Sequence, residues 1–92
     1  MPRWLAFGSQ DEWADVAIFD TALRDTGSWR VSNRTTITNV TVLKDGGVVV
    51  ECHGTDRAEF DGWMRSVGFA AREVAEIRHV ARAGEIWAIA KS

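Results

Sequence analysis

The chain has 92 residues, of which 46% are hydrophobic and 26% are charged, and its formal net charge is -2 at pH 7. This length is typical of one domain with a dense core, and the aromatic and β-branched content excludes a disordered chain. A net charge so near zero gives no overall field that would draw the chain onto nucleic acid or an anionic membrane, so any such contact would depend on a local patch.

Cysteine usage and hydropathy narrow the class of protein further. Cys52 is the only cysteine, so one chain can form neither an internal disulfide nor a thiolate metal cage. The apolar run at the start is too short for a signal peptide, and no apolar stretch is long enough to span a membrane. We therefore expect a single cytoplasmic domain over residues 1–92, without a cofactor and without membrane contact.

The N-terminal third predicts a strand followed by a helix. Trp4–Phe7 reads as a short strand, and Ser9 with Glu12 forms a capping-box pattern that predicts a helix from about Gln10 to Thr26. Gly27 predicts the end of this helix. The side of the helix that we expect in the core carries Trp13, Val16, Phe19 and Leu23.

The middle of the chain predicts a β-hairpin. Thr35–Leu43 and Val48–Cys52 are rich in β-branched residues and flank Lys44–Gly47. The Asp45-Gly46 pair in this connection is a strong signal for a tight hairpin turn.

A second helix is predicted directly after the hairpin. Asp56 is a carboxylate cap, and Glu59 three residues later completes a capping pattern. The Gly68-Phe69 pair predicts the end of the helix. The apolar stripe of this helix comprises Phe60, Trp63, Met64 and Val67.

The last third has two interpretations. Residues 70–82 suit a helix by propensity and spacing. Alternatively, Glu73–Ala81 forms a hairpin with Glu85–Ala90 across Arg82–Gly84. The hairpin is favoured because it gives the apolar run Ile86–Ala90 a sequential partner.

With the hairpin, the element order is β-α-β-β-α-β-β. This order suits an α+β fold in which an antiparallel-rich sheet is covered on one face by two helices. We therefore expect a ferredoxin-like two-layer sandwich.

Parts of the chain resemble two known families. Residues Gly46 to Lys91 resemble the second half of the small bacterial sulfur-carrier proteins, and Leu43–Gly47 resembles a Leu-Lys-x-Gly-Gly turn near the end of class I methyltransferases. The Cys-Pro-x-Pro motif of the sulfur carriers is missing, because the first helix begins Ser9-Gln10-Asp11. The chain is also too short for the methyltransferase cofactor domain. No residue role is carried over from either family.

Reactive side chains are sparse. Cys52-His53 is the only neighbouring nucleophile and base, and adjacent residues of a strand point to opposite faces. A buried structural cysteine is favoured, with a thiol or sulfur-handling protein as the alternative. His53 and His79 match no metal-binding spacing. We expect no metal site and no assembled catalytic centre, although the sequence does not exclude an enzyme that uses Cys52 with His53.

The first predicted helix is acidic. Asp11, Glu12, Asp15, Asp20 and Asp25 stand against Arg24 alone. Such a face is either a solubilising surface or a contact surface for a basic partner, with Ile18 as its apolar centre. The residues predicted to bind this partner are Asp11, Asp15, Ile18 and Asp25.

A second surface combines one tryptophan with two arginines. Trp29, Arg30 and Arg34 could stack on and neutralise single-stranded nucleic acid, or Trp29 could pack at a sheet edge. Because no reactive constellation is evident, we expect a small non-catalytic module that contacts a protein partner or a second copy of itself. Weak nucleic-acid binding through Trp29, Arg30 and Arg34 is a further alternative.

The sequence leaves open the partner's identity, the oligomeric state and the pathway.

Overall fold

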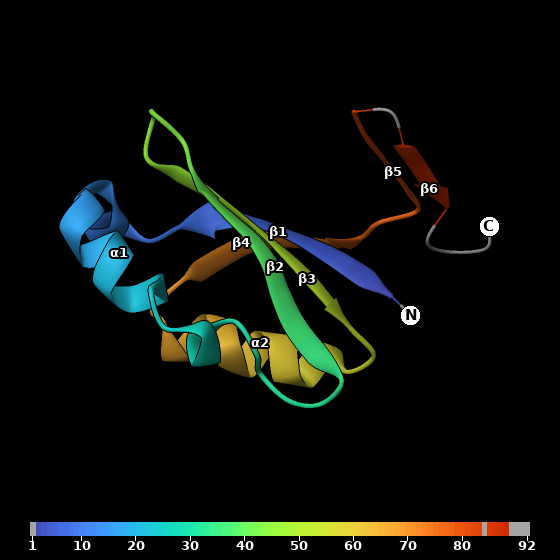
Figure 1. Ribbon diagram of the computed structural model, residues 1–92. Helices are drawn as coiled ribbons and strands as arrows, with labels where there is room; N and C mark the ends of the chain where they lie inside the picture. Colours follow the sequence, from blue (N-terminus) through green and yellow to red (C-terminus); the bar gives the residue numbers. More distant parts are fainter. Residues whose placement is uncertain (1, 84, 89–92) are drawn as a thin grey trace.

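A computed structural model describes residues 2–83 and 85–88 (Figure 1). The chain adopts an α+β fold with a four-stranded antiparallel sheet and two α-helices. A separate two-stranded sheet follows near the C-terminal end of the described residues. In chain order the elements are β1 (Arg3–Ser9), the 3-10 helix η1 (Asp11–Ala14), α1 (Val16–Leu23), the 3-10 helix η2 (Thr26–Ser28), β2 (Thr35–Val42), β3 (Gly47–Gly54), α2 (Arg57–Ser66), β4 (Ala70–Glu76), β5 (His79–Arg82) and β6 (Glu85–Ala88).

The four-stranded sheet has the order β2-β3-β1-β4, and each neighbouring pair is antiparallel. The predicted hairpin is confirmed, because β2 pairs with β3 and Val42 lies opposite Val48. Gly46 occupies the turn with a φ of 95°, a conformation that glycine adopts without steric cost. The β1–β4 pairing contains an irregularity between Phe7 and Gly8.

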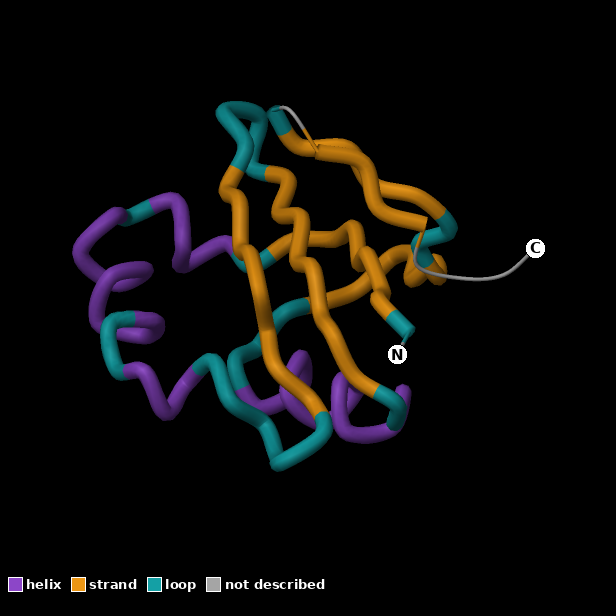
Figure 2. Tube along the Cα trace, turned by 45° about the vertical axis from the view of Figure 1, so that its right-hand side comes forward, coloured by secondary structure: helices purple, strands orange, loops and turns teal. Residues whose placement is uncertain are grey.

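The core lies against one face of this sheet. Alternate residues of β3 are buried, as expected for a strand with one face in the core, and Val50 lies opposite Ala6 while Cys52 lies opposite Ile37. The same core cluster receives side chains from both helices and the segments beside them, namely Trp13, Leu23, Phe60, Trp63, Met64 and Phe69. Figure 2 shows α2 along the sheet and α1 to one side of it.

The second helix follows its prediction closely. The Asp56 side chain accepts a hydrogen bond from the Ala58 N–H at 2.9 Å and caps α2. Gly68, with a φ of 74°, follows the end of the helix. The predicted role of Glu59 in the cap is wrong. Its Oε1 instead accepts hydrogen bonds from the hydroxyls of Ser32 and Thr35, at 2.9 and 2.6 Å, and so joins α2 to the start of β2.

The predicted first helix is divided into three short pieces. Gln10, rather than Ser9, provides the first cap, because its Oε1 accepts from the Glu12 N–H at 2.9 Å. Asp15 has extended backbone angles and starts α1 anew, so the helical phase of η1 does not continue into α1. The predicted burial of Val16 is wrong: this residue begins α1, two turns before the buried Leu23, and its side chain is 76% exposed.

The segment predicted as one strand, Glu73–Ala81, is also divided. Its first part belongs to β4 and pairs with β1, while its second part belongs to β5 and pairs with β6. The predicted pairing with the last apolar run is present, with Val80 opposite Trp87. Residues 84, 89 and 90 of the predicted hairpin lie outside the described residues. The helical alternative for residues 70–82 is wrong, because β4 satisfies its backbone groups against β1.

Candidate functional site

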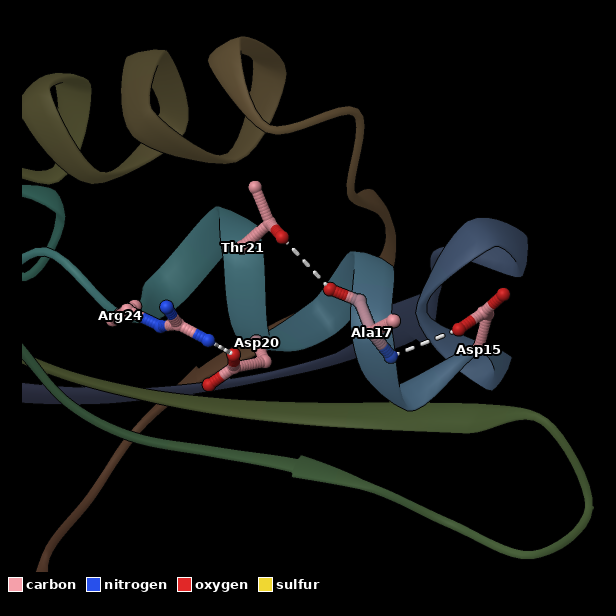
Figure 3. Close-up of polar contacts among 5 residues, drawn as sticks. All are labelled: Asp15, Ala17, Asp20, Thr21 and Arg24. Carbon is pink, nitrogen blue, oxygen red and sulfur yellow. Dashed lines mark hydrogen bonds and ion pairs between the residues drawn. The ribbon is translucent and has the colours of Figure 1, made fainter.

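α1 carries the two most exposed large apolar side chains of the described residues, and its outer face is the side that holds Ile18. Val16 is 76% exposed and Ile18 is 45% exposed, although both lie in a helix. Asp15 caps this helix, since its Oδ1 accepts from the Ala17 N–H at 2.8 Å (Figure 3). The cap begins α1 at Val16, whose side chain is exposed, whereas Leu23 at the other end of the helix is buried.

A shallow apolar groove lies on α1. Its volume is about 390 Å³, and it is lined by Ala17, Ile18, Thr21 and Ala22. The Thr21 hydroxyl donates to the Ala17 carbonyl oxygen at 2.9 Å, so its hydrogen-bonding capacity is used within the helix (Figure 3). Small side chains and a satisfied hydroxyl make this groove suited to an apolar side chain from another molecule.

Acidic side chains lie on α1 and on the segments before and after it. Asp20 forms an ion pair with Arg24 one turn later, and this hydrogen bond raises the pKa of the Arg24 guanidinium (Figure 3). Asp11 is exposed in η1. Asp25 lies beyond the other end of α1 and caps η2, because its Oδ1 accepts from the Gly27 N–H at 3.0 Å.

The predicted partner-binding residues are thus only partly brought together. Asp15 and Ile18 lie at the start of α1, with Asp11 in the preceding 3-10 helix, whereas Asp25 lies past the helix end. Sequence reasoning placed Val16 in the core and so missed its exposure. The signal that could have found it is the aspartate directly before it, because aspartate is among the preferred helix N-caps.

A larger hollow of about 640 Å³ lies beside the β2–β3 turn. Its lining includes Gly46, Gly47 and the exposed side chains of Asp11, Asp45 and Arg72. Exposed polar groups are already well hydrated, whereas exposed apolar side chains gain free energy when a partner covers them. The α1 groove is therefore the better candidate site.

Cys52 is fully buried in the core. Burial, together with the negative charge of Glu59, raises the pKa of its thiol to about 12, so the thiol stays protonated at neutral pH. His53 follows it in a strand whose alternate residues face opposite sides. The pKa of His53 is lowered, first by burial and then by the positive charge of Arg3.

We expect a thiol reagent to label native Cys52 only at the rate at which the protein opens. A thiolate is the reactive species, and neither access nor ionisation is available in the folded state. The measurement is labelling with a chromogenic disulfide at neutral pH, with and without denaturant. Full labelling of the native protein within the mixing time would contradict the buried position.

Of the residues predicted to contact nucleic acid, Trp29 is half-buried. It packs against the core, and its Nε1 donates to the Leu23 carbonyl oxygen at 2.7 Å. Arg30 and Arg34 are exposed. Part of the Trp29 ring is therefore used in core packing, which leaves less of it for stacking on a base.

Among residues 2–83 and 85–88, no group of three or more histidine, cysteine, aspartate or glutamate side chains is placed to hold a metal ion. No helix in the same residues is both long and apolar enough to cross a bilayer. No known protein family, curated protein or solved structure matches this chain.

Proposed function

We propose that the chain is a non-catalytic interaction module that binds a basic protein segment through the outer face of α1. The observation that carries this proposal is Ile18, which is 45% exposed and lines the apolar groove on this helix. Covering an Ile side chain fully stabilises a complex by about 1.5–3 kcal/mol before the costs of association. One such side chain beside a groove suits a transient contact.

The charges around this face favour a basic partner. Asp11, Glu12, Asp15 and Asp20 are exposed along η1 and α1. Carboxylates around an apolar centre steer a cationic segment to the surface and oppose acidic competitors. The expected partner segment therefore carries one apolar side chain for the groove and flanking Lys or Arg residues.

The architecture that presents this face is proposed to be a ferredoxin-like two-layer sandwich that ends at β4. The strand order β2-β3-β1-β4 supports it, as does the position of a helix in each of the two connections that leave the sheet. The hairpin β5–β6 is then an addition to that core. A cytoplasmic location is proposed from the single, buried cysteine.

The test is titration of the isotope-labelled protein with a synthetic amphipathic peptide of alternating Lys and Leu, followed by amide chemical shifts. We expect shifts to concentrate on Val16–Leu23 and to weaken steeply with added salt. Ile18→Asp should weaken binding about tenfold, which corresponds to the loss of roughly 1.4 kcal/mol. Leu43→Asp is the matched control, because Leu43 is 44% exposed on β2's side of the turn and lies outside α1.

Equal loss of affinity in both variants, or shifts spread over the sheet rather than α1, would refute a binding site on this helix. Retained affinity in Ile18→Asp would do the same, because the groove would then contribute nothing. Both variants change exposed side chains, so neither is expected to unfold the chain.

A further inference from the structure

The β5–β6 hairpin has few contacts with the rest of the described chain. Each of its strands spans four residues, and its extensive contacts are between the two strands themselves. Its base is held by the Ile77 N–H, which donates to the Arg3 carbonyl oxygen at 2.8 Å. An isolated two-stranded hairpin is marginally stable in water, so a hairpin of this size is expected to gain from a packing partner.

The segment that leads into and forms β5 is basic, although Glu85 of β6 lies opposite Arg82. The segment from Arg78 to Arg82 contains two arginines and His79, and no carboxylate. Arg78 and His79 are exposed. Val80, half-buried between exposed neighbours, is the apolar residue of this strand. One apolar residue flanked by cations is the pattern that the α1 groove selects.

The two complementary surfaces lie at opposite ends of the molecule. Figures 1 and 2 both show α1 at one side of the sheet and the β5–β6 hairpin at the other. The longest extent of the structure is 38 Å, and the sheet lies between the two surfaces. One copy therefore cannot place its own hairpin on its own α1, whereas a neighbouring copy can.

We infer that the basic segment bound by α1 is the segment Arg78–Arg82, which includes β5, of a second copy of this chain. This inference depends on the proposed function, because it names the partner of the same face. The contact joins two different surfaces, so it is heterologous and builds a head-to-tail chain or a closed ring rather than a two-fold dimer. In such an assembly every α1 groove except the last in an open chain is covered.

The test uses two full-length variants and sedimentation velocity over a range of protein concentrations. Ile18→Asp blocks the groove and keeps the basic segment, while Arg78→Glu replaces one of the two arginines of that segment with a carboxylate and keeps the groove. We expect the wild type to form species larger than dimers, and each variant alone to self-associate at least about tenfold more weakly. An equimolar mixture should stop at a dimer, because one intact groove meets one intact hairpin. Arg65→Glu, an exposed arginine on α2, is the charge-matched control and should assemble like the wild type.

Four outcomes would overturn the inference. A mixture that associates no better than its components shows that groove and hairpin do not meet, and undiminished assembly of Ile18→Asp alone places the contact elsewhere, for instance on the open face of the sheet. A monomeric wild type that still binds the Lys-Leu peptide on α1 removes the second copy as partner and leaves the proposed function standing. A monomer that also fails to bind the peptide removes both.

Discussion

Trp63→Ala is expected to lower the free energy of unfolding by about 4 kcal/mol, a large fraction of the ~5–15 kcal/mol that a domain of this kind possesses. Trp63 is 7% exposed and belongs to the core cluster. Its Nε1 also donates to the Ser28 carbonyl oxygen at 2.8 Å and so joins α2 to η2. The substitution removes the ring, leaves a cavity and deletes this hydrogen bond. Chemical denaturation followed by circular dichroism measures the loss.

Trp63→Phe separates the contribution of the buried ring from that of the hydrogen bond to Ser28. It keeps most of the apolar ring but leaves the Ser28 carbonyl oxygen without its donor, so we expect a smaller loss of about 1–2 kcal/mol. Glu73→Ala, at an exposed position of β4, is the surface control and should change stability by less than about 0.5 kcal/mol. If Trp63→Ala were no more destabilising than Glu73→Ala, the indole would not be part of the core.

The elements that could be predicted from the sequence are those set by local signals. In α2, the Asp56 cap, the stripe with Trp63 and the Gly68 stop lie within one continuous segment. The β2–β3 hairpin is similarly local, because Asp45-Gly46 determines the turn and the register follows from it. Local signals agree with the tertiary structure in both places, so a single sequence is sufficient to find them.

The first helix could not be predicted in detail, because two caps compete within a few residues. Ser9 and Glu12 form the better sequence pattern, yet Ser9 ends β1 and lies opposite Gly47. Gln10 replaces it through a contact that no local pattern reveals: its Nε2 donates to the Val67 carbonyl oxygen at 2.7 Å, 57 residues away. This tertiary contact holds the start of η1 against the end of α2, and Asp15 then restarts the helix in a new phase.

Contacts between distant residues also limit the prediction of the C-terminal strands. Pairing of β4 with β1 joins residues far apart in the sequence, such as Trp4 and Glu76, and this pairing, rather than propensity, decides against a helix at Val74. In the candidate site, Ile18 could be selected from its place among acidic residues. The sequence pattern assigns Val16 to the core because the predicted helix runs unbroken through Asp15, where the structure begins α1.

Gly8→Ala is expected to destabilise the protein by about 3 kcal/mol, at the upper end of what overpacking costs. A Cβ atom on Gly8 would lie 2.0 Å from the Ala70 carbonyl oxygen and 2.8 Å from its carbonyl carbon. Both are backbone atoms at the irregularity where β4 meets β1, so no side-chain rotation can relieve the overlap. The strands must separate locally, and β4 lies at the sheet edge with β1 as its only neighbour in the four-stranded sheet. Denaturant unfolding gives the loss in free energy, and amide hydrogen exchange in β4 reports whether the separation is local.

Gly62→Ala is the matched control, because it makes the same chemical change in the middle of α2. There a Cβ atom would meet only the end of the Arg65 side chain, at 3.9 Å. Alanine is the better helix former, so this variant should be more stable than the wild type by about 0.5–1 kcal/mol. The two substitutions are thus predicted to change stability in opposite directions, and the difference comes from the backbone around each glycine. If Gly8→Ala were neutral, with β4 amides as protected as in the wild type, β1 and β4 could not approach as closely as the structure has them.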